Sequence, residues 1–148
     1  MKRHQHGRMP TRPDEYREDT AELARPKEAA TLIVVRAGPK PTLLIGKRAA
    51  SHRFMPNKFV FPGGRLDLID PRLQVPGDLS RPVMERLRKA TRKTMNDRKL
   101  RGLALAAIRE TFEETGLIVG RPASRPAMTT HSVWRDYFGH GAEPPLEH

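Results

Sequence analysis

Cysteine is absent from the 148 residues of this chain. Disulfide bonds and thiolate catalysis are therefore excluded, and the composition fits a reducing compartment. No apolar run approaches the length of a membrane span, and the polar N-terminus lacks the apolar region of a signal peptide. We therefore expect a cytoplasmic chain with no membrane span.

Aromatic residues are also scarce, at 5%, and hydrophobic residues make up only 36% of the chain. The length suits one domain with a small core, flanked by much irregular chain. Residues 1–27 contain three prolines and few apolar positions, which predicts a flexible N-terminal arm preceding a domain over 28–148. His4 and His6 have no ligand partners nearby in sequence, so we interpret them as ordinary tail residues.

Positive charge dominates, with a net charge of +11, but it is unevenly placed. Residues 71–101 carry ten basic and three acidic side chains, whereas residues 102–148 carry four and six. A basic surface around an acidic site attracts phosphate esters, and it attracts nucleic acid non-specifically as well. Charge alone leaves both kinds of partner open.

The first half of the chain has the pattern of short strands. Residues 31–35 and 42–46 predict two strands joined by a tight loop, and residues 58–61 predict a third. The third strand is expected to stop at Pro62-Gly63-Gly64. The glycine pair indicates either a simple turn or a close approach of the backbone to a ligand or helix.

The second half has the pattern of helices. Ser80 and Pro82 predict the start of a basic amphipathic helix of about four turns. A second helix is predicted over about 100–115, ended by Gly116, and a short strand or an extended connection is predicted to begin over 117–119. Thr129 or Thr130 is expected to cap a third helix through residues 133–138, with no strand after it. We interpret Trp134 in that helix as a buried anchor rather than a base-stacking residue.

Three acidic residues share one face of the second helix. Glu110, Glu113 and Glu114 stand at i, i+3 and i+4, so their carboxylates lie close together and repel one another unless a cation is present. Such oxygen-rich clusters suit hard divalent ions, Mg²⁺ or Mn²⁺. A solvated acidic helix face is the simpler interpretation of these three residues alone.

The segment Arg109-Glu110-Thr111-Phe112-Glu113-Glu114-Thr115-Gly116-Leu117, with the earlier Pro62-Gly63-Gly64, resembles the Nudix hydrolase signature G-x5-E-x7-R-E-U-x-E-E-x-G-U, where U is aliphatic. There are three departures. Asp70 stands at the first acid of the signature, 38 residues instead of seven separate it from Arg109, and Thr111 replaces an aliphatic residue. The additional residues between Asp70 and Arg109 form a basic insertion at about 71–101. Nudix family members that resemble peroxisomal coenzyme A diphosphatases have an insertion at the same place in the signature.

This resemblance implies an α/β/α sandwich with a mixed β-sheet, incomplete at its C-terminal end because residues 118–148 lack the expected further strands and closing helix. It also implies metal-dependent attack of water on the pyrophosphate of a nucleoside diphosphate linked to another moiety, including coenzyme A-like substrates. By the same resemblance, Glu110, Glu113 and Glu114 would bind Mg²⁺ or Mn²⁺ with the Gly64 carbonyl, and Arg109 would orient the carboxylates.

The resemblance does not assign the phosphate-contacting residues or the general base to particular positions. Arg48 and Arg53 lie in a loop placed like the segment before the glycine pair in coenzyme A-cleaving members, so they are candidates for phosphate contacts along with Gly63 and Gly64. The general base is not identified by the resemblance; His52, Glu143 and Glu147 are weak candidates. A catalytically silent basic module for RNA or an acidic partner is the alternative function, and homodimerisation through the basic insertion is compatible with either.

Overall fold

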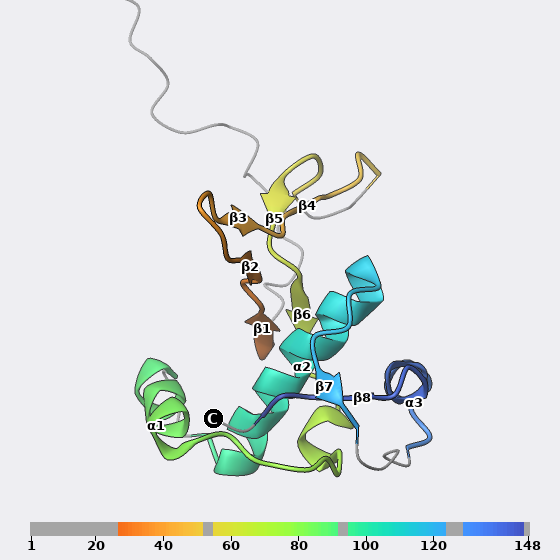
Figure 1. The fold of residues 1–148 in the computed structure, drawn as a ribbon. Helices are drawn as coiled ribbons and strands as arrows, with labels where there is room; N and C mark the ends of the chain where they lie inside the picture. Colours follow the sequence, from red (N-terminus) through yellow and green to blue (C-terminus); the bar gives the residue numbers. More distant parts are fainter. Residues whose placement is uncertain (1–26, 52–54, 92–94, 124–128, 147–148) are drawn as a thin grey trace, which may run out of the picture.

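A long helix, α2 (Asp97–Thr115), forms the centre of the molecule in this computed structural model, which describes residues 27–51, 55–91, 95–123 and 129–146. Helices α1 (Arg81–Ala90) and α3 (Ser132–Gly139) lie on either side of it (Figure 1). α2 also contacts a short 3₁₀ helix, η2 (Asp70–Arg72), and two strands, β1 (Ala29–Thr31) and β6 (Gly63–Arg65). The acidic segment therefore lies on the element that most of the described fold packs against.

The ends of α2 follow from its sequence. The Asn96 side chain accepts a hydrogen bond from the Lys99 backbone N–H, so the helix begins at Asp97, three residues before the predicted start. At the other end, Gly116 adopts a left-handed conformation with φ of 68°, which a glycine tolerates without strain. The predicted end of the helix is confirmed.

In the described ranges the strands form four two-stranded antiparallel pairs, of which three lie in the first half of the chain. β1 pairs with β6, β2 (Val35–Arg36) with β3 (Thr42–Leu43), and β4 (Gly46–Lys47) with β5 (Phe59–Val60). The predicted pairing of residues 31–35 with 42–46 is confirmed in Val35↔Leu43. The predicted stop of the third strand before the glycine pair is confirmed, because β5 ends at Val60. The sequence did not predict that both glycines lie in a further strand, β6, with Thr31 opposite Gly63 and Ala30 opposite Gly64.

The mixed sheet expected from the family resemblance is not seen among the described residues, where all strand pairs are antiparallel. The elements still combine helices with small sheets, as an α/β fold does. Residues 117–119 form no strand, which leaves the connection as the remaining alternative. The prediction of no strand after the last helix was wrong, because β7 (Arg121–Pro122) pairs with β8 (Ala142–Glu143), which follows that helix. The pair forms because α3 and its Gly141 turn bring the chain back beside residue 121.

The third helix begins at Ser132, with the His131 side chain as its N-cap. Thr129, predicted as a possible cap, accepts instead from the His131 N–H through its hydroxyl oxygen. Local geometry therefore places the cap one residue after the two threonines.

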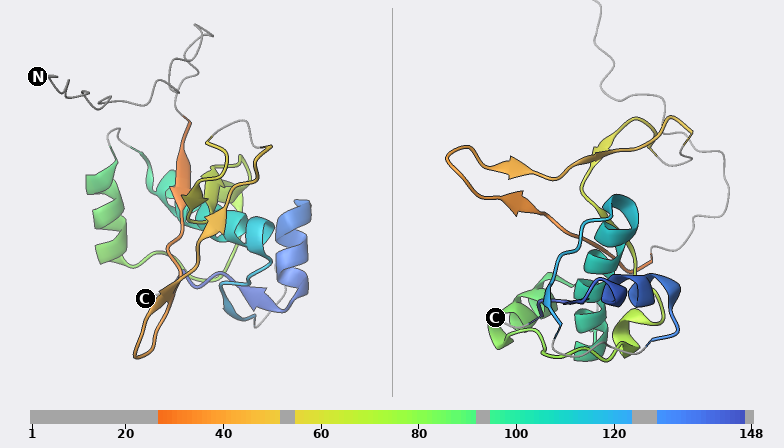
Figure 2. Two further views of the ribbon diagram at one scale, coloured as in Figure 1. Left: turned by 90° about the horizontal axis from the view of Figure 1, so that it is seen from above. Right: turned by 45° about the vertical axis from the view of Figure 1, so that its right-hand side comes forward.

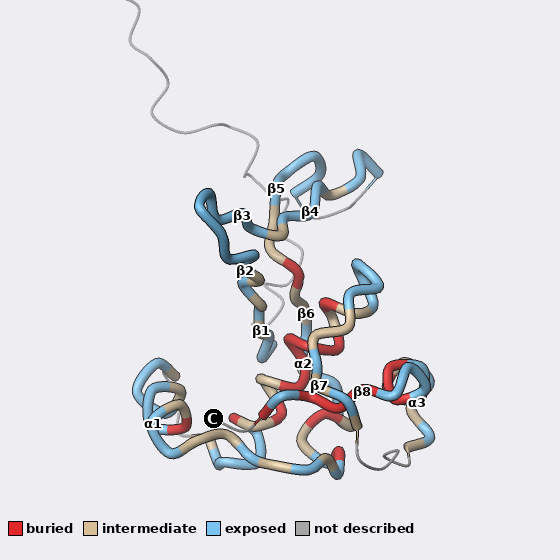
Figure 3. The backbone as a smooth tube through the Cα atoms, viewed as in Figure 1, coloured by how far each residue is buried: buried red, intermediate tan, exposed pale blue. Residues whose placement is uncertain are grey.

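Burial is concentrated around α2, α3 and β8, as Figure 3 shows, and the strands β2 to β5 are mostly exposed. The core cluster consists of Leu73, Leu105, Ile108, Trp134, Tyr137, Phe138, Ala142 and Leu146. In Figure 2 the β2–β3 hairpin extends away from the helices. Among the helices of the described ranges, none has the length and apolar character needed to cross a membrane.

The two ends of the basic segment are hydrogen-bonded to each other. Arg98 donates to the Pro71 carbonyl and Arg101 to the Leu73 carbonyl, both at 2.9 Å. Gly102 allows this contact, because a Cβ there would overlap the ring of Pro71. Within the segment, α1 has ten residues, which is shorter than the predicted four turns.

Candidate active site

Arg109 joins two of the three predicted carboxylates. Its Nη1 donates to Glu110 Oε1 at 3.1 Å and to Glu113 Oε2 at 3.0 Å. The Arg109 side chain is only 6% exposed, so these charge-assisted bonds are shielded from solvent. The guanidinium thus bridges Glu110 and Glu113, and the orienting role that the family resemblance implies for Arg109 stays a prediction.

Asp70 fixes the guanidinium from the other side. Asp70 Oδ1 accepts from Arg109 Nε and Asp70 Oδ2 accepts from Arg109 Nη2, both at 3.1 Å. Arg109 Nη2 also donates to the Arg65 carbonyl at 2.8 Å, at the end of β6. Asp70 is fully buried, so the two halves of the split signature are joined by a buried, two-point ion pair.

Gly64 gives Glu110 the space that its carboxylate occupies. A Cβ built at position 64 would overlap the carboxylate atoms of Glu110. The glycine pair therefore allows a close approach between strand and acidic helix, which was one of the two interpretations left open by the sequence. This cradle is the structural reason for glycine at position 64.

Glu114 lies at a separate edge of the same glycine strand. The Gly63 N–H donates to Glu114 Oε2 at 3.2 Å. Both residues line a cleft of about 400 Å³ whose opposite wall comes from β4 and its end; the lining is Gly46, Lys47, Arg48, Val60, Pro62, Gly63, Glu114 and Thr115. The cleft brings a predicted phosphate-contacting residue, Arg48, together with a predicted metal ligand.

The electrostatics of the cluster are unbalanced toward negative charge. Burial raises the pKa of Glu110, the charges of Glu113 and Glu114 add to that effect, and Arg109 opposes it only in part. Burial disfavours the charged form of Arg109, but hydrogen bonding and charge from Asp70, with the charges of Glu110 and Glu113, raise its pKa above the ordinary value. A cation would relieve the repulsion that remains among the glutamates.

The donor set fits a hard divalent ion in its chemistry, because carboxylate oxygens are the ligands that such ions prefer. In the described ranges, however, no three His, Asp or Glu side chains converge in an arrangement that could hold a metal ion. The reason is visible in the contacts, since Glu110 and Glu113 are turned toward Arg109 while Glu114 is turned toward Gly63. Each of these bonds uses a single carboxylate oxygen, so Glu110 and Glu113 can keep their bonds to Arg109 while their second oxygens turn toward an ion shared with Glu114.

Thr111, which replaces an aliphatic residue of the signature, is fully buried. Its hydroxyl donates to the Ala107 carbonyl at 2.7 Å, one turn earlier in α2. The polar group is therefore satisfied within the helix and the substitution leaves no unpaired donor under the acidic face.

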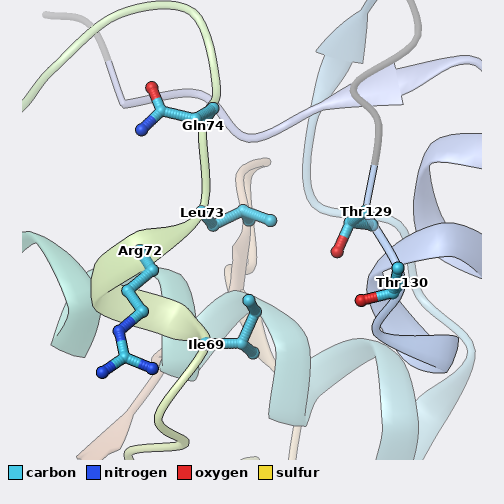
Figure 4. A pocket seen from close by; sticks show the side chains of 6 residues that line it. All are labelled: Ile69, Arg72, Leu73, Gln74, Thr129 and Thr130. Carbon is cyan, nitrogen blue, oxygen red and sulfur yellow. The ribbon is translucent and has the colours of Figure 1, made fainter.

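A second cavity, of about 380 Å³, lies between η2 and the residues before α3 (Figure 4). Its lining is Ile69, Arg72, Leu73, Gln74, Thr129 and Thr130. In Figure 4 the two threonine hydroxyls and the apolar side chains of Ile69 and Leu73 face one another, whereas Arg72 and Gln74 extend away. None of the three helical glutamates lines this cavity, so we do not assign it to the candidate active site.

The remaining sequence candidates divide into two groups. Arg53, His52, Glu147, His4 and His6 lie outside the described residues. Glu143 is buried in β8 and accepts from Arg121 Nε at 2.9 Å, while its Oε2 has no hydrogen-bond partner among the described residues. This ion pair, between β7 and β8, gives Glu143 a role in strand pairing.

No protein-family model and no curated protein matches this chain. Among solved structures, the crystal structure of a NUDIX hydrolase from Alicyclobacillus acidocaldarius is similar to it, with a TM-score of 0.51 and 25% sequence identity. The similarity covers 82% of this chain and 57% of the hydrolase, so the chain spans a little over half of that protein's length. The similarity supports a Nudix-like α/β fold.

Sequence reasoning placed Asp70 in the signature but gave it no role, and it did not single out Lys47. The signal for Asp70 was its position at the first acid of the signature, which already implied proximity to Arg109. No sequence pattern indicated a role for Lys47, because its position in the cleft depends on the pairing of β4 with β5.

Proposed function

We propose that the chain acts as a Nudix hydrolase that cleaves the pyrophosphate of a nucleoside diphosphate linked to another moiety, using Mg²⁺ or Mn²⁺. The observation that carries this proposal is the arrangement of Glu110 and Glu114 against the Gly63-Gly64 strand. Three carboxylates on one helix face, two of them held by Arg109, have no evident use in packing. Binding of a hard cation would explain why three carboxylates lie together on this face.

In this proposal Glu110, Glu113 and Glu114 would hold the ion, with the Gly64 carbonyl. When bound, a divalent cation neutralises diphosphate charge and lowers the pKa of water, so that hydroxide forms near neutral pH. Arg109 keeps Glu110 and Glu113 in place without itself contacting substrate. Lys47 and Arg48, on the far wall of the cleft, contact the phosphate oxygens.

The reaction proposed is hydrolysis of a phosphoric anhydride. The water oxygen forms a bond to one phosphorus, the bridging P–O bond breaks, and two products that each carry phosphate are released. A coenzyme A-like diphosphate is the narrower substrate class suggested by the position of the basic insertion. The absence of cysteine is consistent with the cytoplasmic setting expected from the sequence.

A library of diphosphates assayed with Mg²⁺ and with Mn²⁺ tests the proposal. Glu114→Gln removes a charge without changing the shape of the side chain, and we expect kcat to fall at least about tenfold. Glu85→Gln is the matched control, because Glu85 is an exposed residue of α1 whose ion pair is with Arg81. Turnover that is equal in both variants and in the unaltered chain would rule out the proposed role of Glu114.

A basic binding module is the second candidate, favoured by the pairing of Glu110 and Glu113 with Arg109 rather than with a converging third carboxylate. It predicts salt-sensitive binding of a polynucleotide and no hydrolysis of any diphosphate in the library. The same library experiment, repeated with a fluorescent single-stranded RNA at two salt concentrations, separates the two functions.

A further inference from the structure

The indole of Trp134 is directed at the carboxylate that holds the site arginine. Trp134 is fully buried in α3, and its Nε1–H donates to Asp70 Oδ1 at 3.0 Å. The same oxygen accepts from Arg109 Nε at 3.1 Å. A buried tryptophan needs an acceptor for its N–H, but a backbone carbonyl would serve that need equally well. Here the acceptor is the ion-pair partner of Arg109.

Four donors surround the Asp70 carboxylate, two on each oxygen. Trp134 Nε1 and Arg109 Nε donate to Oδ1, while Arg109 Nη2 and the Asp67 backbone N–H donate to Oδ2. A carboxylate that is held in this way cannot rotate without breaking several bonds. Its plane therefore fixes the plane of the guanidinium, and so the direction of Arg109 Nη1, which binds Glu110 and Glu113.

Aromatic packing fixes the indole in turn. The Trp134 ring lies edge-on to Tyr137, with ring centroids 5.3 Å apart, and stacks on Phe138 at 5.6 Å. The direction of the Trp134 N–H is thus set by the core of α3 and not by the site itself. A connection results from α3 through Asp70 and Arg109 to the helical glutamates.

We infer that Trp134 is a positioning residue for the Glu110 and Glu113 carboxylates, acting through Asp70 and Arg109. The inference rests on the proposed function, because the positioned carboxylates are the proposed metal ligands. Without the indole N–H, Asp70 Oδ1 loses one of its two donors and the guanidinium gains freedom to turn. The glutamates are then less well placed to bind a cation together.

The chain contains a single tryptophan, so biosynthetic replacement of tryptophan by 3-benzothienylalanine alters position 134 alone. The sulfur analogue keeps the shape of the ring system and removes the N–H. Trp134→Phe is a second variant that removes the same donor with a smaller ring. Tyr137→Phe is the control, because Tyr137 lies in the same helix and core but donates to the Val119 carbonyl at 2.7 Å, not to Asp70.

Two measurements on the full chain test the inference. In a calorimetric titration with Mn²⁺ and no substrate, we expect affinity about tenfold weaker in both position-134 variants and changed less than about twofold in Tyr137→Phe. By NMR, we expect the Arg109 Nε–H to exchange with water about tenfold faster in the position-134 variants, as the loss of one hydrogen bond to a charged group would produce.

The outcomes separate the inference from the function on which it rests. If the unaltered chain binds no Mn²⁺, the proposed function fails, and Arg109 exchange alone decides whether Trp134 positions the guanidinium. If Mn²⁺ binds but both the affinity and the Arg109 exchange rate of the benzothienyl protein equal those of the unaltered chain, the positioning role is overturned. Loss of affinity in Tyr137→Phe as large as in Trp134→Phe would also overturn it, because it would indicate a general effect of core packing.

Discussion

Asp70 and Arg109 are separated by 38 residues, yet they form a two-point ion pair with both bonds at 3.1 Å. The basic segment between them forms a loop that leaves the fold after Asp70 and returns before Arg109. Pro71 packs against Gly102 where the two ends of this loop meet. The two halves of the split signature therefore meet as if the insertion were absent. Stability and site geometry depend on the same pair.

Asp70→Ala is expected to destabilise the fold by about 3–5 kcal/mol, because it leaves the buried Arg109 charge without its main partner. The free energy of unfolding, measured with urea, checks this. Asp97→Ala is the matched control, since Asp97 pairs with Arg88 at the surface and its side chain is 61% exposed. Its loss is expected to change stability by less than about 1 kcal/mol. Equal effects of the two variants would contradict the structural role assigned to Asp70.

Sequence reasoning located the acidic helix and its end because these features are local. The spacing of Glu110 and Glu114 and the left-handed Gly116 follow from helical periodicity and from the freedom of glycine. The same reasoning found the end of β5 before the glycine pair but did not predict that Gly63 begins another strand. Its place in β6 depends on pairing with Thr31, and strand pairing between distant residues has no local sequence signal.

The contact between Trp134 and Asp70 illustrates the same limit. The sequence interpretation of Trp134 as a buried anchor is confirmed. No pattern in the sequence indicated which acceptor its N–H would find 64 residues away. Strand β8 was missed for a related reason, because Ala142 and Glu143 lie among glycine and proline and pair only after α3 has reversed the chain.

Gly64→Ala is expected to disrupt the candidate site, because the added methyl group would occupy the space of the Glu110 carboxylate. We expect Mn²⁺ affinity to fall at least about tenfold, and stability to fall by about 1–3 kcal/mol from overpacking. Gly139→Ala is the control, since a Cβ there meets no atom within 4 Å. Unchanged Mn²⁺ affinity in Gly64→Ala, measured by calorimetry, would show that Glu110 is not a ligand.

Lys47→Ala tests the basic wall of the cleft. Lys47 faces the cleft that Glu114 also lines, so its removal should weaken substrate binding more than turnover. We expect KM to rise about tenfold, in line with the loss of one hydrogen bond to a charged group, with little change in kcat. Lys40→Ala, in the loop between β2 and β3 and outside the cleft lining, is the control. A rise in KM that is equal for both lysines would indicate a general effect of net charge.

Ionisation of Tyr137 is expected to lower the stability of the fold at alkaline pH. Burial raises the pKa of its phenol to about 12, with a further contribution from the charge of Glu143, whereas an unfolded tyrosine ionises near its ordinary value of about 10. Between those values the unfolded chain releases this proton and the folded chain retains it. The free energy of unfolding therefore falls as pH rises from about 10 to about 12, and this contribution is fully present below about pH 10.

Tyr137→Phe removes the titrating group, so the difference in unfolding free energy between the variant and the unaltered chain isolates its effect. At pH 8 the variant is expected to be less stable by about 1 kcal/mol, from loss of the hydrogen bond to the Val119 carbonyl. That difference should shrink and then reverse sign as pH approaches 12, because only the unaltered chain has a phenol at position 137 whose ionisation stabilises the unfolded state. A difference that is constant from pH 8 to pH 12 in urea unfolding would show that the Tyr137 phenol is not held in its neutral form by the fold.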